Sequence, residues 1–277
     1  MPDQSALNAI LQPGGITPLY QPIVRLALNG GGPKIVAVEC LSRGPKGTNF
    51  ESAPILFDYV RYKREESLVD RACISAALER AASLPPALQL CVNVHASTLG
   101  RDVSFVPFLR SVAKRARIPM SRLTVEVVEH APPWDNASFI AAIAALRVAG
   151  AKVAVDDVGL GQSNFKMLID VSPDYLKLDR YFVDRCVDDP KRQAVISAVA
   201  RLSAEFGAEV VAEGVEDEAV IAVLQRYGIS LMQGYYFAYP MPAEEVAAIV
   251  TYSDTRQRNM DEPAARKRFA SSPPLTD

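Results

Sequence analysis

The stretch KVAVDDVG (Lys152–Gly159) is an apolar run that ends on two adjacent carboxylates, and a similar arrangement recurs along the chain. Five other apolar runs carry a polar or charged group at or near their ends: IVAVECL (Ile35–Leu41), LQLCVNV (Leu88–Val94), LTVEVVE (Leu123–Glu129), YLKLD (Tyr175–Asp179) and EVVAEGV (Glu209–Val215). A lone carboxylate in an apolar strand is costly to bury unless something pairs with it. Five acidic groups, one amide and one lysine at the same place in successive strands therefore predict a shared site, and divalent metal is the natural partner for so much negative charge.

Helix-like segments separate these runs. We expect helices over 55–82, 105–116, 136–149, 192–206 and 217–227, and a final strand over Ser230–Phe237. Strands that alternate with helices predict a parallel sheet. About eight such units in roughly 250 residues favour a closed barrel, in which reactive groups lie at the C-terminal ends of the strands.

The two faces of each strand differ in character. Thr124 and Glu126 lie on one face of their strand because side chains alternate, whereas Val125 and Val127 lie on the other. We therefore expect one face to pack on helices and the other to carry small or polar groups into the barrel.

Composition limits the classes of function. The chain has 277 residues, 49% of them apolar, and a formal charge of −2, so neither nucleic acid nor an anionic membrane is an expected partner. We find no run of eighteen apolar residues and no signal-peptide pattern at the N-terminus. The four cysteines form no CxxC pair, which suits a reducing compartment. A cytoplasmic protein is expected.

The polar groups suit phosphoryl chemistry. Two adjacent carboxylates, Asp156 and Asp157, can bind two cations, and two metals about 3.5–4 Å apart clamp the attacking and leaving oxygens of a displacement. All-oxygen ligands favour Mg²⁺ or Mn²⁺ over Zn²⁺. Each residue also has a structural alternative. The Asp-Asp pair could begin a loop, Glu126 and Lys177 could form a buried ion pair, and Gln233 could belong to a turn.

The chain resembles the EAL domain family, the bacterial phosphodiesterase module for cyclic di-GMP. The resemblance covers about residues 19–242, with eight motifs in the family's order: YQPIV (Tyr20–Val24), ECLSR (Glu39–Arg43), VNVHAS (Val92–Ser97), EVVE (Glu126–Glu129), DDVGLG (Asp156–Gly161), KLDRYFV (Lys177–Val183), AEGVE (Ala212–Glu216) and QGYYFAYPMP (Gln233–Pro242). We expect a lead-in over 1–18, the EAL domain over 19–250 and a disordered tail over 251–277.

The resemblance implies an α/β fold, a modified TIM (β/α)8 barrel with one antiparallel strand. It also implies hydrolysis of cyclic di-GMP to linear pGpG by water activated at two Mg²⁺ or Mn²⁺ ions, with inhibition by Ca²⁺. The implied metal ligands are Glu39, Asn93, Glu126, Asp156 and Asp157. The other implied roles are catalysis by Lys177, Glu213 and Gln233, nucleotide binding by Gln21 and Arg43, and bracing of the loop after Asp157 by Glu129.

The chain departs from the family pattern in three places. Cys40 replaces the alanine of EAL, and Val128 replaces the threonine of E-x-T-E. The loop DDVGLGQSNFKML stands where the family has DDFGTGYSSL, so Val158, Leu160, Gln162 and Asn164 are altered. In the family this loop orders the second metal and often contributes to dimerisation. Its alteration therefore bears on turnover and leaves a homodimer open.

Three functional hypotheses follow. The first is a metal-dependent phosphodiesterase, which the full set of metal ligands favours. The second is a cyclic di-GMP receptor with little turnover, because the altered loop misplaces the second metal. The third is an interaction adaptor without nucleotide, against which the presence of Gln21 and Arg43 argues.

Overall fold

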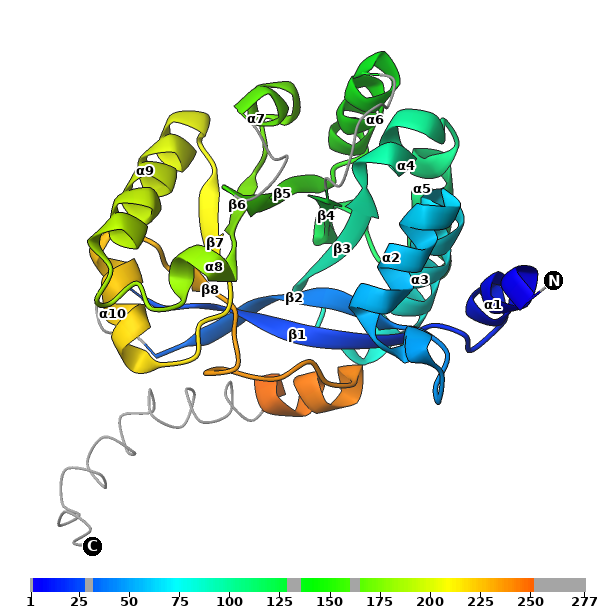
Figure 1. Ribbon diagram of the computed structural model, residues 1–277, viewed down its shortest axis with the longest axis horizontal. Coiled ribbons are helices and arrows are strands. Elements are labelled where there is room, and N and C mark those ends of the chain that lie inside the picture. Colours follow the sequence, from blue (N-terminus) through cyan, green and yellow to red (C-terminus); the bar gives the residue numbers. More distant parts are fainter. Residues whose placement is uncertain (1, 28–31, 129–135, 160–164, 252–277) are drawn as a thin grey trace, which may run out of the picture.

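Eight strands close into a barrel in chain order, from β1 to β8 (Figure 1). The structure is a computed structural model that describes residues 2–27, 32–128, 136–159 and 165–251. The strands are β1 Thr17–Arg25, β2 Lys34–Arg43, β3 Gln89–His95, β4 Leu123–Val128, β5 Lys152–Val158, β6 Tyr175–Leu178, β7 Glu209–Ala212 and β8 Leu231–Met232. β1 runs antiparallel to both of its neighbours, β2 and β8, whereas the remaining neighbours are parallel. The predicted barrel with one reversed strand is confirmed.

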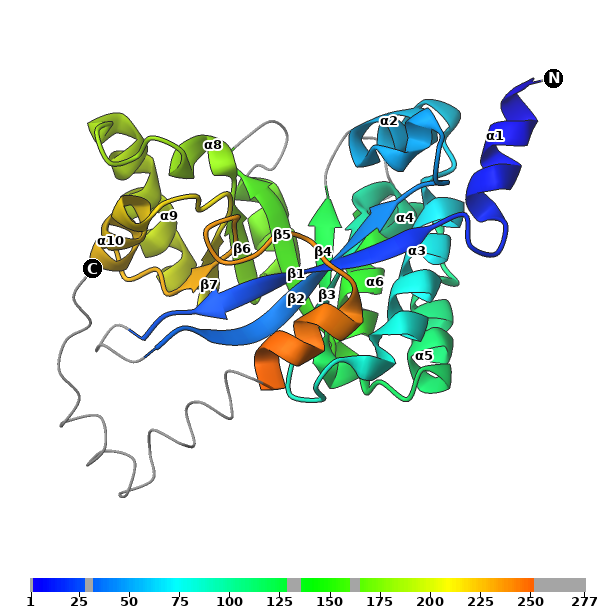
Figure 2. The same cartoon turned by 90° about the horizontal axis from the view of Figure 1, so that it is seen from below.

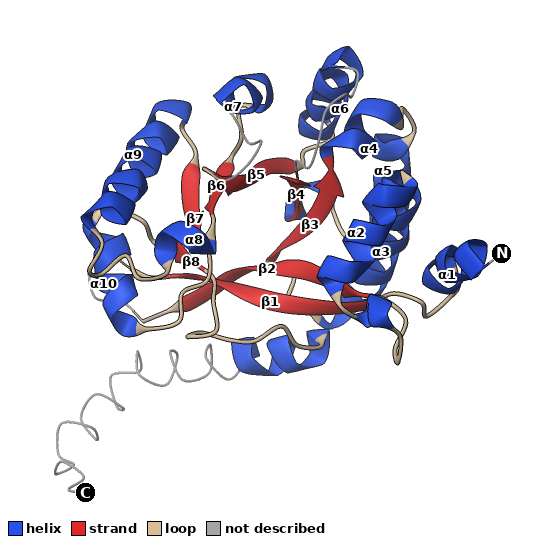
Figure 3. Cartoon of the chain, in the orientation of Figure 1, coloured by secondary structure: helices blue, strands red, loops and turns tan. Residues whose placement is uncertain are grey.

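Helices surround the ring of strands (Figure 3). They are α1 Pro2–Leu11, α2 Ala53–Lys63, α3 Glu66–Arg80, α4 Ala96–Arg101, α5 Phe105–Arg115, α6 Asn136–Val148, α7 Phe165–Val171, α8 Arg180–Val183, α9 Pro190–Phe206 and α10 Glu218–Arg226, with 3-10 turns at Asn49–Glu51, Ala81–Ser83 and Met120–Arg122. Residues 243–251 form a further helix outside β1 and β2. Among the described residues, no helix is both long and apolar enough to cross a membrane.

The alternation within each strand divides the core as predicted. Val92, Val94, Val125 and Val127 are fully or almost fully buried against the surrounding helices. A separate cluster that includes Ile23, Ala37, Cys91, Val211 and Leu231 lines the barrel interior around a cavity of about 180 Å³. Glu126 and Lys177, polar members of the inward face, line the same cavity, so the polar groups lie next to this apolar lining.

The segment 55–82 forms two helices, so the prediction of one helix is wrong. α2 ends at Lys63, and Arg64 follows in the left-handed conformation (φ 58°) with its N–H donating to Val60 O and Arg61 O. This cap turns the chain before α3 begins at Glu66. The apolar positions continue on both sides of the break, and periodicity alone did not reveal it.

The predicted last strand, Ser230–Phe237, is also wrong in length because β8 ends at Met232. Gly234 turns the chain there: a Cβ on it would lie 2.1 Å from Val215 O, so only glycine allows this approach. Phe237 N then donates to Gly234 O over 3.0 Å. β7 likewise ends at Ala212, before the predicted Val215.

The N-terminal segment packs on the barrel's helices. Leu7 and Ile10 of α1, together with Ile16, form a buried cluster with Leu56 and Val60 of α2. The predicted tail lies almost wholly in 252–277, outside the described residues.

Candidate active site

The C-terminal end of the barrel collects polar side chains from every strand. Figure 2 shows α2 and α8, which follow β2 and β6, at this same end. On β1 and β2, Gln21 pairs in register with Glu39, and on β3 and β4, Asn93 pairs with Glu126. Of these four side chains, Gln21, Glu39 and Glu126 are buried. The sequence-based prediction that these strand ends share one site is therefore matched by their placement.

A bulge at the end of β5 changes the backbone conformation at Asp156 and Asp157. The register between β5 and β6 shifts between Val155 and Val158, and Asp157 lies in the left-handed region with φ 51°. A non-glycine residue in this region stores strain, and such residues and bulges concentrate at functional sites.

Lys177 of β6 occupies the centre of the carboxylates. Its Nζ lies 2.6 Å from Glu213 Oε1, 2.8 Å from Glu126 Oε2, 3.1 Å from Asp156 Oδ1 and 3.4 Å from Glu39 Oε2. The side chain is only 2% exposed. One ammonium therefore faces four carboxylates, which leaves negative charge in excess inside the barrel. We call Lys177 and these four carboxylates the acidic ring.

Amide side chains hold Glu39 in place. Asn93 Nδ2 donates to Glu39 Oε1 over 2.9 Å, and Gln233 Nε2 donates to Glu39 Oε2 over 2.7 Å. Gln233 Nε2 also lies 2.9 Å from Gln21 Oε1. Gln233 Oε1 is buried and accepts no hydrogen bond within the described part of the chain, so it can accept one from a bound water or ligand.

The charge excess appears in the pKa values. Burial, with the neighbouring Glu39 and Asp156, raises the pKa of Glu126 to about 8 in spite of Lys177. Burial and the charge of Asp156 raise the pKa of Asp157 to about 6, and burial raises the pKa of Glu213 well above its ordinary value. Burial would also raise the pKa of Glu39, but Lys177 and the two amides outweigh it and lower that pKa.

These residues fit a divalent cation. Asp156, Asp157 and Glu213 each offer one oxygen, and the three oxygens lie within 4.8 Å of one another. The donor set is carboxylate and amide oxygen, which Mg²⁺ and Mn²⁺ prefer. A cation here would also favour the charged forms of Glu126, Asp157 and Glu213, whose pKa values are raised without it.

Glycine conformation sets the position of Glu213. Gly214 has φ 66°, and a Cβ on it would lie 2.5 Å from Arg180 Cγ. The chain can therefore pass close to α8 only with glycine at this point, which fixes the adjoining Glu213 against Lys177.

Two of the cavities beside the acidic ring are lined by both Glu39 and Asp156. One, of about 380 Å³, extends toward Arg43 and α2. The other, of about 260 Å³, extends toward Arg180 and Tyr235. Arg43 lines the first cavity and Gln21 lines the second.

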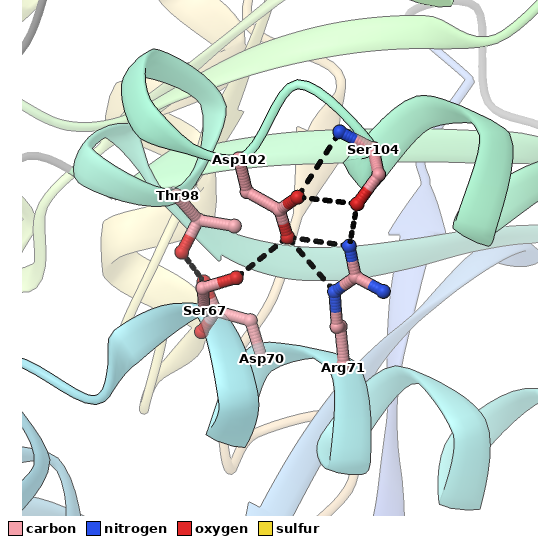
Figure 4. Close-up of polar contacts among 6 residues, drawn as sticks. All are labelled: Ser67, Asp70, Arg71, Thr98, Asp102 and Ser104. Carbon is pink, nitrogen blue, oxygen red and sulfur yellow. Dashed lines mark hydrogen bonds and ion pairs between the residues drawn. The ribbon is translucent and has the colours of Figure 1, made fainter.

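A hydrogen-bond network anchors the wall of the first cavity (Figure 4). Asp70 of α3, which is 2% exposed, accepts from the backbone N of His95 (3.0 Å) and from Thr98 Oγ1 (2.6 Å), and its Oδ1 lies 2.8 Å from His95 Nδ1. Asp102 accepts from Ser67 Oγ over 2.6 Å and from Arg71 Nη2 over 2.6 Å. The bonds of Asp70 fasten α3 to His95 at the end of β3, and those of Asp102 fasten α3 to the segment between α4 and α5.

Two features of the site were not anticipated. Asp179 directly follows β6, and its carboxyl group hydrogen-bonds Asp157 and raises that residue's pKa. The sequence could have indicated Asp179, because it ends the apolar run YLKLD just as Asp157 ends the apolar run KVAVDD. The Asp70–His95 pair joins residues 25 positions apart and had no signal in strand periodicity. Glu129, predicted to brace the loop after Asp157, and the altered loop positions Leu160, Gln162 and Asn164 lie outside the described residues.

The fold and site define a class: an α/β barrel with one reversed strand and an acidic, lysine-centred site at its C-terminal end. The EAL domain family profile matches residues 4–240, and the chain belongs to this family. The predicted family membership is therefore confirmed.

Known proteins agree with this assignment. The cyclic di-GMP phosphodiesterase RocR of Pseudomonas aeruginosa is 32% identical over 240 residues, which cover 84% of this chain and 59% of RocR. The solved PaMucR phosphodiesterase in complex with c-di-GMP matches with a TM-score of 0.76 and 25% identity, covering 89% of this chain and all of that chain (100%). The EAL enzyme Bd1971, bound to cAMP and cyclic di-GMP, shares the fold with a TM-score of 0.79, 24% identity, and coverage of 90% and 68%. The chain spans 59% of RocR and 27% of a second relative, the phosphodiesterase PA2567 of the same organism.

Proposed function

We propose that this EAL domain hydrolyses cyclic di-GMP to linear pGpG with divalent metal. The observation that carries the proposal is the convergence of Glu39, Glu126, Asp156 and Glu213 within 3.4 Å of one buried lysine. The printed names of RocR and of the PaMucR complex support cyclic di-GMP as the substrate.

The residues that would hold two Mg²⁺ or Mn²⁺ ions are Glu39, Asn93, Glu126, Asp156 and Asp157, with Glu213 binding directly or through water. When bound, such ions lower the pKa of water and neutralise phosphate charge. The excess of carboxylates over ammonium supports this assignment, because an uncompensated cluster of buried charge is otherwise unfavourable.

The chain's own groups have separable tasks. Lys177 Nζ presents its donors within the acidic ring, where it would orient the attacking water and stabilise developing charge. Gln233 Oε1 would accept a hydrogen bond from the same water. Arg43, beside the first cavity, would hold a phosphate through its forked donors, and Gln21 would contact the nucleotide from β1.

The receptor alternative depends on the altered loop Val158–Asn164. Of its members, Val158 is buried in the core beneath the site, at 6% exposure. Val158 keeps the end of β5 packed, so it gives no support to the receptor alternative. That alternative therefore depends on residues 160–164, which lie outside the described residues.

Product analysis tests the proposal. Purified protein is incubated with cyclic di-GMP and Mg²⁺ or Mn²⁺, and nucleotides are separated by chromatography. We expect pGpG, no product with EDTA, and binding without cleavage in Ca²⁺, whose looser geometry places the water poorly. Tight binding with intact ligand in Mg²⁺ and Mn²⁺ would establish the receptor instead, and absence of binding would favour the adaptor.

Three further expectations stay predictions. They are the division of the chain at residues 18 and 250, a cytoplasmic location, and the homodimer. Proteolysis, fractionation and light scattering respectively would test them.

A further inference from the structure

The cavity inside the barrel is distinct from the first and second cavities at the C-terminal end. It has a volume of about 180 Å³ and is lined by residues of all eight strands, among them Ala37, Cys91, Thr124 and Ala154. These four side chains are small, so the layers of bulky residues that usually fill the inside of such a barrel are interrupted here. We call this space the interior cavity.

The interior cavity extends from the N-terminal face of the barrel to the underside of the acidic ring. Gln89 and Tyr175, the first residues of β3 and β6, line its outer end together with Arg25, the last residue of β1. The Arg25 side chain is 41% exposed, so this end lies at the surface. Glu126 and Lys177 line the inner end, and Lys177 also lines the second cavity. A molecule in the interior cavity would thus lie below Lys177, on the side away from the C-terminal end.

The size of the interior cavity suits a molecule built on one ring. An apolar cavity of about 150 Å³ is enough to hold benzene. At about 180 Å³, the interior cavity has room for such a ring with one further polar group. Ile23, Val211 and Leu231 give it an apolar wall on which the ring can pack.

Two buried oxygens in the cavity wall have no hydrogen-bond partner among the described residues. They are Thr124 Oγ1, in a residue that is 1% exposed, and Gln89 Oε1 nearer the outer end. The Gln89 amide is held in place because its Nε2 donates to Ser121 O over 3.2 Å. Buried polar atoms normally have partners, so the Thr124 hydroxyl favours a ligand that carries a hydroxyl group of its own.

The charges around the interior cavity favour a neutral ligand. An anion would lie beside Glu126, and a cation would lie beside Lys177 and Arg25. These charged groups already have partners, because Lys177 Nζ lies 2.8 Å from Glu126 Oε2 and Arg25 Nη1 lies 2.6 Å from Glu209 Oε2. A charged ligand would therefore lose its hydration without gaining an unpaired counter-ion among the described lining residues.

We propose that the interior cavity binds a compact neutral molecule, a phenol or an alcohol of similar size, which enters from the N-terminal face of the barrel. The apolar body of this ligand packs on Ile23, Val211 and Leu231, and its hydroxyl group hydrogen-bonds Thr124 Oγ1. The site goes beyond the proposed hydrolysis of cyclic di-GMP and does not depend on it.

Phenol is the probe that tests the proposal, with benzene as the ligand without a hydroxyl group and benzoate as the charged one. The full-length protein in EDTA is titrated calorimetrically with each, and a crystal soaked in phenol locates the ring. Thr124→Val removes the hydroxyl and keeps the shape, and Ala154→Leu fills the cavity. Ala144→Leu makes the same change at an exposed position of α6 and is the matched control. Circular dichroism verifies that each variant is folded.

We expect phenol in the interior cavity with its oxygen within about 3.2 Å of Thr124 Oγ1, and no binding of benzoate. Thr124→Val should weaken phenol binding about fivefold and leave benzene binding unchanged, because one hydrogen bond is lost. Ala154→Leu should abolish phenol binding, and Ala144→Leu should bind phenol as the wild type does. If Ala154→Leu does not fold, the Thr124→Val comparison decides.

Three results would overturn the site. They are ordered water alone in the interior cavity of the soaked crystal, phenol bound only elsewhere, and equal losses of phenol and benzene binding in Thr124→Val. None of them bears on the proposed function, because the titrations contain neither metal nor nucleotide.

Discussion

At the scale of single residues, Lys177 has one observed role and one proposed role. Its ammonium is the counter-ion of four carboxylates, and in the proposed reaction it would also donate a hydrogen bond to the attacking water. Burial lowers the pKa of Lys177, but Asp156, Glu126 and the other carboxylates outweigh it and raise that pKa well above its ordinary value. The ammonium therefore stays charged throughout the physiological pH range.

Lys177→Met tests both roles. The change leaves buried carboxylates without their cation, so we expect the free energy of unfolding in EDTA to fall by about 3–5 kcal/mol. Turnover of cyclic di-GMP in Mg²⁺ should fall by about 10²–10³. Urea denaturation and initial rates measure the two effects. Lys152→Met, whose ammonium is less buried and bonds Tyr175 Oη, is the control and should retain turnover. Unchanged turnover in Lys177→Met would exclude the catalytic role.

Glu126→Gln should separate stability from catalysis. Because the pKa of Glu126 is raised to about 8, its carboxyl group is largely protonated at pH 7 without metal, and a neutral amide replaces it closely. We expect the free energy of unfolding in EDTA to change by less than about 1 kcal/mol, since the amide replaces a protonated carboxyl group beside Lys177. Metal-dependent turnover should fall at least about 100-fold, because a neutral amide oxygen binds a divalent cation more weakly than a charged carboxylate does.

The control for this variant is Glu209→Gln, which breaks the partly exposed pair of Glu209 with Arg25 far from the ring. It should retain full turnover. A Glu126→Gln protein that loses several kcal/mol in EDTA would show that Glu126 is charged without metal.

At the scale of elements, strand periodicity predicted most of the site. β5 and β6 lie within the predicted runs Lys152–Gly159 and Tyr175–Asp179, each ending one residue earlier, because both runs are short and largely apolar. The alternation of side chains along β4 predicted that Glu126 faces inward. The expectation that reactive groups lie at the C-terminal ends of the strands predicted that it lies near Glu39 and Asp156. Periodicity could not predict the cap at Arg64, the early end of β8 or the contact of Asp70 with His95. Each of these depends on backbone conformation or on tertiary contact rather than on a repeat.

The contact of α3 with α4 and α5 is predicted to be structural rather than catalytic. Asp102 has a 14% exposed side chain and accepts hydrogen bonds from Ser67, Arg71 and Ser104 (Figure 4). Asp102→Ala removes the acceptor that these donors share, and Arg71 keeps only its bond to Ser104 Oγ, so we expect a loss of about 2–3 kcal/mol in the free energy of unfolding. We expect kcat to stay within about twofold, which corresponds to a change of less than about 0.5 kcal/mol in the activation free energy.

Asp184→Ala is the matched control, since that carboxylate is half exposed and lies 3.7 Å from Arg185. Denaturant midpoints and steady-state rates on both variants measure the comparison. A loss of kcat in Asp102→Ala comparable to its loss of stability would show that the network positions the site.

At the scale of the whole molecule, the acidic ring links stability, pH and metal. Glu126 and Asp157 have pKa values raised to about 8 and about 6. The folded protein therefore binds protons that the unfolded chain has already released between about pH 5 and pH 8. The stabilisation from these groups is complete below their unfolded pKa values and is lost as pH rises through the folded ones.

Metal-free protein should therefore become less stable as pH rises from 5 to 8, with Tm falling by about 5 °C or more. His95, whose pKa Asp70 raises against the effect of burial, acts in the same direction. Saturating Mg²⁺ should remove or reverse this fall, because it binds the charged carboxylates of the folded state. Thermal melts in EDTA and in Mg²⁺ across this range measure it. A Tm that rises toward pH 8 in EDTA would contradict the proposed charge excess.

The measurement that tests the central claim most directly is anomalous diffraction from crystals of the full chain soaked in Mn²⁺. The account predicts two anomalous peaks about 3.5–4 Å apart, both within the oxygens of Glu39, Asn93, Glu126, Asp156 and Asp157. A single peak, or none among these oxygens, from protein that hydrolyses cyclic di-GMP in solution would contradict a two-metal site in the acidic ring.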